Sequence, residues 1–239
     1  MSKAYNGTEV LRRTSVEIDS GEFIAFVGPS GCGKTSLLRM IADLESPDSG
    51  EITIGNAKTS TVRRSRKIGY ISQSPATIPW KSAIEDVSFT QSLTGSSKFS
   101  PKELLVDFGL QDHLDKLPHQ LSGGMLQRVN LASAIAHDPE LLLMDEPFSA
   151  LDEIKREEMG AWLNRTIDGL NKTIVFVTHS VDEAVMLADR VFVFSKAPGE
   201  LIADIAINHE QPRTSQFRYH PKFSELTRQI RRILHGDTP

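Results

Sequence analysis

The stretch GPSGCGKT, residues 28–35, constrains the fold more than any other part of the chain. It follows the apolar run EFIAFVG and precedes residues whose apolar side chains recur at helical spacing. A glycine-rich turn between a buried strand and a helix lets backbone N–H groups surround a phosphate at the positive end of the helix dipole. We therefore predict an α/β domain with a phosphate loop here, because a chance glycine-rich turn would leave the flanking strand and helix unexplained.

The side chains of this loop have separate expected roles. The Lys34 ammonium should reach the β and γ oxygens of a nucleotide, and the Thr35 hydroxyl should ligate Mg²⁺. Cys32 occupies a free position of the pattern, so its thiol is incidental. The nucleotide-binding residues expected here are Gly28, Pro29, Ser30, Gly31, Cys32, Gly33, Lys34, Thr35 and Ser36. The following helix should end by Pro47 and Gly50 and bury Leu37, Leu38, Ile41 and Leu44.

Several short runs are apolar at every position, which is typical of strands buried on both faces of a parallel sheet. Helical patterns separate them along the chain, as expected for an α/β domain with a mostly parallel core sheet. The predicted strands lie within residues 22–28, 67–72, 141–145, 173–178 and 190–195.

Residues 82–121 carry helical spacing without a strand candidate, so we predict a helical subdomain inserted into the sheet domain. The chain is then one domain, 1–239, in which this subdomain also takes in the start of the next helix. The nucleotide-binding core is expected at 1–81 and 122–210, and a C-terminal helical tail at 211–239. In that tail one helix should pack on the domain, rather than lie on a membrane surface, through Phe223, Leu226, Ile230, Ile233 and Leu234.

Two acids follow the apolar run LLLMD at 141–145. The Asp145 carboxylate can hold Mg²⁺ through its water shell, and Glu146 is the candidate general base for an attacking water. If they only capped a strand end, the apolar strand would bury them without a cation, which is unfavourable.

Gln73 and His179 each follow a predicted strand. Ligands of parallel α/β sheets bind outside the carboxyl ends of the strands, so these side chains should face the same crevice as Lys34 and Asp145. Either residue alone is more often an ordinary loop or capping residue. Their convergence with the phosphate loop indicates a site, and its magnesium ligands are expected to be Thr35, Gln73 and Asp145.

A second glycine-rich turn, LSGGM, opens at Leu121. Ser122 is a good N-cap for a helix that should stop at Asp138 and Pro139, and Gly123 and Gly124 leave its first N–H groups bare for an anion. The nucleotide of the same chain is already enclosed by the Gly28 loop. We therefore interpret the turn as a contact for the γ-phosphate bound by a second copy; the alternative is a simple helix cap with tight packing.

The composition excludes some function classes. Charged residues make up 24% of the chain and the net charge is −4, which gives no overall attraction for nucleic acid. No apolar run approaches the roughly 18 residues that a transmembrane helix needs. The single cysteine excludes an internal disulfide, and the first ten residues lack the apolar core of a secretory signal, so we expect a cytoplasmic location.

The order of these motifs resembles the ATP-binding subunit of ABC transporters over nearly the whole chain. The matching stretches are GPSGCGKT, Gln73, LSGGM, LLLMDEP, SALD at 149–152 and VTH ending at His179. The resemblance implies the P-loop ABC-type ATPase fold, in which an antiparallel β part accompanies the mostly parallel core sheet and the inserted helical subdomain. It implies an ATP-sandwich dimer, formed with an identical or similar subunit, in which Glu146 is the base and His179 senses the γ-phosphate. It also implies that Ser122–Gly124 act across the interface, that Asp152 links the two sites, and that Tyr5 stacks on adenine.

A finer resemblance is to the nitrate, sulfonate and taurine importer group, through IPW at 78–80, the THSVDEAVMLADRV segment, and SKAPGELIADIAI leading to QPR at 211–213. It implies a membrane permease as partner, an extracytoplasmic solute-binding protein acting indirectly, and a place on the cytoplasmic face of the inner membrane. Related transporters carry thiamine precursors, aromatic acids or bicarbonate, so the solute stays open.

Two features depart from the family pattern. Only four residues precede Tyr5, so we expect either that the strand usually found before this aromatic is missing or that the start of the chain is misplaced. Ser133 stands where the family usually has arginine, so an interface or subdomain contact is expected to be weaker.

Two other functions fit the sequence less well. A soluble ABC ATPase of DNA repair or translation usually has coiled-coil arms or two cassettes in one chain, and neither pattern occurs here. A small-molecule P-loop kinase would leave LSGG, SALD and His179 unexplained.

Overall fold

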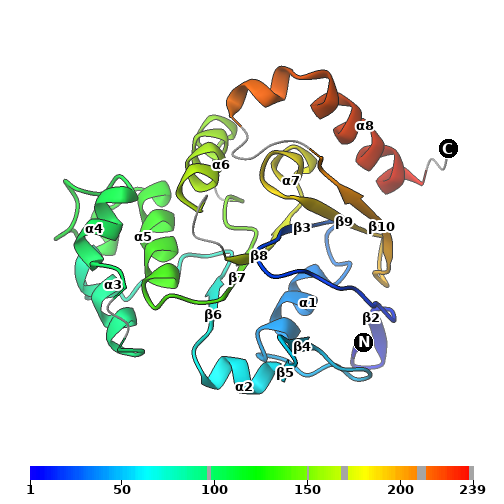
Figure 1. Cartoon of the computed structure of the whole chain (residues 1–239), viewed down its shortest axis with the longest axis horizontal. Helices are drawn as coiled ribbons and strands as arrows, with labels where there is room; N and C mark the ends of the chain where they lie inside the picture. The colour runs from blue at the N-terminus through cyan, green and yellow to red at the C-terminus, as the bar shows by residue number, and fades with distance from the viewer. Residues whose placement is uncertain (96–97, 150, 168–171, 209–213, 237–239) are drawn as a thin grey trace.

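The core of the computed structural model is a six-stranded sheet, seen nearly edge-on in Figure 1. The structure describes residues 1–239 except 96–97, 150, 168–171, 209–213 and 237–239. All neighbouring strands in the sheet are parallel except the antiparallel pair at one edge. The strand order is β10 (Leu201–Ala206), β9 (Arg190–Phe194), β3 (Phe23–Val27), β8 (Thr173–Thr178), β7 (Leu141–Asp145) and β6 (Ile68–Ile71).

The five predicted strands are confirmed, because each lies in a run predicted from its continuous apolar sequence. In β3, Phe23 and Ala25 belong to one hydrophobic cluster, while Ile24 and Phe26 belong to the other. Both faces of the sheet are therefore covered, which is the condition under which a strand carries apolar residues at every position.

Different helices cover the two faces. On one face α1 (Lys34–Ile41) packs against β7 and β8, while α7 (Val181–Leu187) packs against β3 and β8 on the other. The neighbours of α7 are α6 (Glu153–Ile167) and α8 (Pro221–His235), and α8 also contacts β9. The fold is thus α/β with a mostly parallel core sheet, as predicted.

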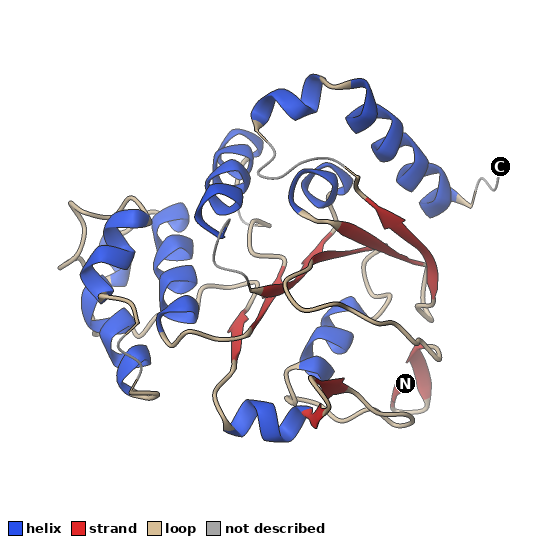
Figure 2. Cartoon of the chain, in the orientation of Figure 1, coloured by secondary structure: helices blue, strands red, loops and turns tan. Residues whose placement is uncertain are grey.

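Three helices pack on one another to one side of the sheet, where Figure 2 shows them as a separate group. They are α3 (Ala83–Ser92), α4 (Pro101–Asp107) and α5 (Gly123–Ala136), and the short 3-10 helix η1 (Pro118–Gln120) leads into α5. The Ser133 hydroxyl of α5 donates a 2.8 Å hydrogen bond to the buried Asp86 carboxylate of α3. Ser133 therefore holds two helices of this group together without the arginine that the family usually has.

Smaller antiparallel pairs flank the sheet. One joins β1 (Lys3–Tyr5) to β2 (Thr8–Leu11), and another joins β4 (Thr53–Ile54) to β5 (Ala57–Lys58), which precedes α2 (Thr59–Arg64). The expectation of a missing strand before the aromatic is therefore wrong, because three residues suffice to pair with β2. The pair turns at Asn6 and Gly7, which both have positive φ.

The first helix is shorter than predicted. It ends at Ile41, and Asp43 adopts a left-handed backbone with φ 57°. The chain reverses there before it reaches Leu44, whose side chain is 54% exposed instead of buried. The prediction that Leu44 extends the buried face is wrong for this reason.

The C-terminal helix packs on the domain as predicted. The 3-10 helix η2 (Ser215–Tyr219) precedes α8, and the α8 residues Phe223, Leu226 and Ile230 are buried. The predicted QPR stretch at 211–213 lies outside the described residues. Within the part of the chain that the structure describes, no helix is both long and apolar enough to cross a bilayer.

Candidate nucleotide site

The phosphate loop connects β3 to α1. Gly33 has φ 94°, a left-handed conformation that costs glycine little, and α1 begins at the next residue. The buried Lys34 ammonium turns back into the loop, where it donates to the carbonyl oxygens of Gly28 (2.7 Å) and Pro29 (2.9 Å). Ser30 and Gly31 form the exposed tip. The loop thus encloses the positively charged Lys34 ammonium next to the start of α1.

The hydroxyl of Thr35 lies beside the carboxylate that ends β7. Its Oγ1 donates a 2.9 Å hydrogen bond to Asp145 Oδ1. Burial, reinforced by the charge of Glu146, raises the pKa of the Asp145 carboxyl, while the Thr35 hydrogen bond opposes that rise. A hydroxyl and a carboxylate are hard oxygen donors, and Mg²⁺ is usually held by one or two such groups while it keeps its other oxygens from water and phosphate. These two side chains therefore fit Mg²⁺.

Glu146 lies between the ends of two neighbouring strands. Its Oε2 is 3.4 Å from Gln73 Nε2, just beyond β6, and 3.4 Å from His179 Nδ1, just beyond β8. Its own backbone has φ 44°, which is uncommon for a residue with a Cβ. The structure thus brings Gln73, Glu146 and His179 together at the carboxyl ends of β6, β7 and β8. We call these three residues the Glu146 group.

Tyr5, the predicted adenine-stacking residue, lies over the start of α1. Its hydroxyl is 3.1 Å from Ser36 Oγ and also donates to the Glu45 carboxylate. Burial and the Glu45 hydrogen bond raise the pKa of the Tyr5 hydroxyl. The ring is 39% exposed, so one side is accessible next to a residue of the predicted nucleotide site.

The second glycine-rich turn makes no hydrogen bond to the Glu146 group among the described residues. The Ser122 hydroxyl caps α5 by accepting from the Met125 N–H at 3.3 Å, as predicted, and Ser122 and Gly123 are exposed. Exposed Asp152 caps α6 through the Lys155 N–H at 3.0 Å, and this bond lowers the pKa of Asp152. Among the described residues, no hydrogen bond joins Ser122 or Asp152 to the Glu146 group. Ala150, within the predicted SALD stretch, lies outside the described residues.

Sequence reasoning did not identify a buried carboxylate that supports the His179 turn. Glu183 of α7 accepts a 2.5 Å hydrogen bond from Thr178 Oγ1, and the Arg156 guanidinium of α6 lies 3.4 Å from it. Burial raises the pKa of the Glu183 carboxyl despite both partners. Its partners lie on other elements, so no local pattern marks this residue.

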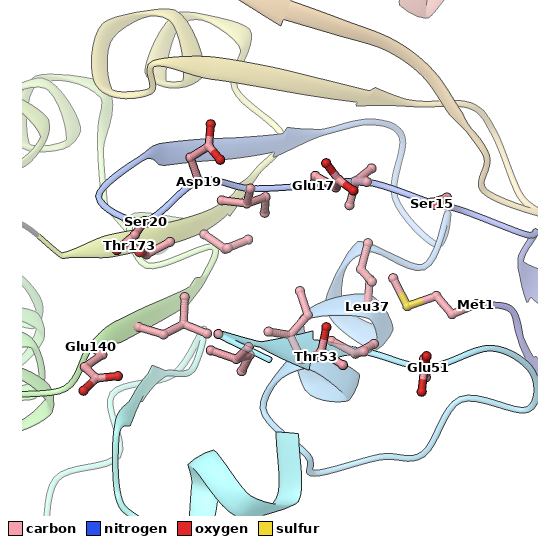
Figure 3. Close-up of a pocket in the computed structure, with 18 of the residues that line it drawn as sticks. Met1, Ser15, Glu17, Asp19, Ser20, Leu37, Glu51, Thr53, Glu140 and Thr173 are labelled. Carbon is pink, nitrogen blue, oxygen red and sulfur yellow. The ribbon is translucent and has the colours of Figure 1, made fainter. Parts of the chain in front are cut away.

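A cavity of about 700 Å³ lies near the opposite ends of the strands (Figure 3). Its lining includes Thr173, the first residue of β8, and Glu140, just before β7, together with Leu37 of α1. None of the predicted nucleotide-site residues lines it. The candidate site is therefore the group of contacting side chains at the carboxyl ends and not this cavity.

Comparison with known proteins now identifies the family. Residues 11–149, which include the phosphate loop, Gln73 and Glu146, match the family model described as ABC transporter. The chain belongs to the ABC transporter family. As an ABC protein with this site it is an ATPase, and a similar solved cassette is a post-hydrolysis state bound to ADP and Pi.

Relatives align over almost the full chain. A putative ATP-binding protein of Brucella abortus is 38% identical, covering 98% of this chain and 91% of the relative. An aliphatic sulfonates import ATP-binding protein of Agrobacterium fabrum is 39% identical, with 90% and 81% covered. A sulfate/thiosulfate import ATP-binding protein of Pseudomonas putida is 41% identical, with 92% and 69% covered.

The structural comparison agrees with the family. The dimeric ADP- and Pi-bound cassette has a TM-score of 0.75 and 30% identity, covering 87% of this chain and 96% of that one. A second dimeric structure, of a bacterial ABC transporter cassette, has a TM-score of 0.74 and 29% identity, with the same coverage. The predicted family and ABC fold are thus confirmed.

Proposed function

We propose that the chain is the ATP-hydrolysing subunit of an importer for a small solute and works as an ATP-sandwich dimer. The observation that carries the dimer is the exposure of Ser122 and Gly123 in the second turn, where a Cβ added at Gly123 would meet no atom within 4 Å. A helix N-terminus with exposed N–H groups and open space at Gly123 can receive an anion held by a second copy. The dimeric state of both similar solved cassettes supports this arrangement.

Within one site, the roles follow from the contacts. Lys34 would exchange its two carbonyl contacts for β and γ oxygens of ATP, and Tyr5 would stack on adenine. Glu146 would take the proton of the attacking water, while His179 would hold the γ-phosphate and Gln73 would complete the metal site. Bound to Thr35 and Asp145, Mg²⁺ would neutralise charge on the phosphate oxygens. Ser122, Gly123, Gly124 and Asp152 would act on the partner's nucleotide.

We also propose that a membrane permease binds the helical subdomain, residues 82–121 with the start of α5, near Pro79 and Trp80. The Trp80 side chain is 77% exposed. The ammonium nitrogen of the neighbouring Lys81 lies 5.1 Å from the ring centroid of Phe89 in α3. An apolar and cationic surface is therefore available beside the helical subdomain. Closure of the dimer on ATP would then reach the permease through this subdomain, as ligand binding that favours one state shifts the population toward it.

The solute and location belong to the same proposal. Two relatives are named as sulfonate and sulfate/thiosulfate import proteins. We infer a nitrate-, sulfonate- or taurine-like solute, delivered by an extracytoplasmic binding protein, with the ATPase on the cytoplasmic face of the inner membrane.

Two experiments test the proposal. The Glu146→Gln chain should bind ATP with Mg²⁺, hydrolyse it on the order of 10²-fold or more slowly, and elute as a dimer only with ATP. A Glu146→Gln chain that turns over ATP normally would remove the base role. Tagged protein extracted in detergent should co-purify with a multi-span membrane protein, whereas recovery of ribosomes or DNA would favour the repair or translation class.

A further inference from the structure

The loop between β9 and β10 touches the backbone of the phosphate loop. Gly199 of this loop is buried, and a Cβ added to it would lie 1.8 Å from the Cys32 carbonyl oxygen. Such a separation is far below any van der Waals contact, so only glycine fits while the Cys32 peptide keeps its position. Residue 199 therefore shares a backbone contact with a residue of the predicted ATP site.

Gly199 cannot easily move away from Cys32, because it is bonded on its other side. Its N–H donates to the Val10 carbonyl at 2.8 Å, and its own carbonyl accepts from the Arg12 N–H at 2.8 Å. These bonds extend a parallel bridge to Leu11, at the end of β2. A side chain at 199 would thus displace the phosphate loop more readily than the loop that carries it.

The β9–β10 loop is itself fixed by one hydroxyl. Ser195 Oγ accepts from the Glu200 N–H at 3.0 Å and donates to the Lys196 carbonyl at 3.0 Å. The Ser195 N–H also donates to the Glu200 carbonyl at 2.9 Å. These bonds close the loop on both sides of Gly199.

Two other close approaches come from the same elements. A Cβ at Gly28 would lie 2.9 Å from the carbonyl oxygen of Phe194, the last residue of β9, and one at Gly33 would lie 3.1 Å from that of Val10. The phosphate loop is thus held at its beginning by the end of β9, at its middle by the β9–β10 loop and at its end by β2.

We propose that Gly199 is a positioning residue for ATP: its contact with Cys32 keeps the phosphate loop in the shape that binds phosphate. The inference rests on the proposed ATP site. Gly199 touches no nucleotide in this account and acts through the backbone of Cys32.

The Gly199→Ala chain tests this, with the only cysteine of the protein as a reporter. Cys32 is 0% exposed, so a thiol reagent should react slowly with the wild type. In Gly199→Ala, ATP affinity should fall roughly tenfold or more, and labelling of Cys32 should become faster. Gly69→Ala is the matched control, because a Cβ there would lie 2.8 Å from the Ala134 carbonyl, which belongs to α5 and not to the phosphate loop. It should lower the thermal midpoint but leave ATP affinity and Cys32 labelling near wild-type values.

Unchanged ATP affinity and labelling in Gly199→Ala would overturn the inference, as would equal effects in Gly69→Ala. If Gly199→Ala does not fold, Ser195→Ala decides instead: faster labelling with weaker ATP binding supports the inference, and wild-type values for both overturn it. A wild-type chain that binds no ATP would contradict the proposed function itself, which separates the two failures.

Discussion

The two glycine-rich turns of this chain both lead into a helix, yet they differ in their surroundings. The turn before α1 is enclosed at its base, since a Cβ at Gly28 would meet the Phe194 carbonyl and Lys34 already bonds to the loop. The turn before α5 is exposed, and a Cβ at Gly123 would meet nothing within 4 Å. Packing within the chain explains Gly28 and Gly33 of the first turn, but no packing contact explains Gly123. This contrast favours an intermolecular role for the second turn.

The largest expected effect tests whether the second turn serves another copy. Ser122→Arg should abolish hydrolysis by closing the partner's site, and Lys34→Ala should do so by disabling its own, each by on the order of 10²-fold or more. Mixing the two chains should restore at most one working site per mixed dimer, measured as phosphate release. Ser100→Arg is the matched control, because Ser100 is also an exposed N-cap, of α4, and it should hydrolyse ATP normally.

Full restoration of hydrolysis in the mixture would contradict the shared site. Loss of ATP binding by Ser122→Arg alone would instead place the second turn in the site of its own chain.

A pair of matched alanines tests the difference in packing. Gly28→Ala should weaken ATP binding by roughly tenfold or more, because its Cβ meets backbone. Gly123→Ala should bind ATP like the wild type, measured by calorimetry, but hydrolyse it more slowly. Equal ATP affinities in the two variants would erase the contrast between the turns.

The body of α5 is anchored even though its first turn is exposed. Ser133→Ala should lower the free energy of unfolding by about 1.5 kcal/mol, because the buried Asp86 carboxylate then loses a hydrogen bond. Chemical denaturation measures this, with Ser88→Ala as a control whose hydroxyl donates to the Ile84 carbonyl within α3. A smaller loss for Ser133→Ala than for Ser88→Ala would argue against the anchor.

The smallest effect concerns the cap. Ser122→Ala should cost about 1 kcal/mol of unfolding free energy, the usual value for a lost N-cap. Ser100→Ala at α4 should cost a similar amount, since its hydroxyl also accepts from the third N–H of its helix. Only Ser122→Ala should in addition slow hydrolysis, and equal hydrolysis rates in both would leave Ser122 as a cap alone.

The sequence predicted the buried sheet because every position of a doubly covered strand is apolar. It did not predict β10, whose outer position leaves alternate residues exposed, nor the two-residue strands β4 and β5. Such strands are too short or too mixed for periodicity to mark them. The early end of α1 was not predicted either, because the left-handed turn falls on Asp43 and not on a glycine or next to a proline.

The residues of the site were also predicted only in part. Lys34, Thr35, Asp145 and Glu146 were predicted because they stand in local motifs at strand ends. Gly199, Glu183 and Asp86 were missed because each acts on a segment brought to it by the fold. A single sequence records no such pairing between distant residues.

The left-handed backbone of Glu146 has an evolutionary consequence. Glycine would take φ 44° without steric penalty, and asparagine would do so more readily than glutamate. Selection for fold stability alone would therefore replace the glutamate at this position. An unusually heat-resistant descendant with glycine at position 146 would be a protein that gained stability when it lost its catalytic base.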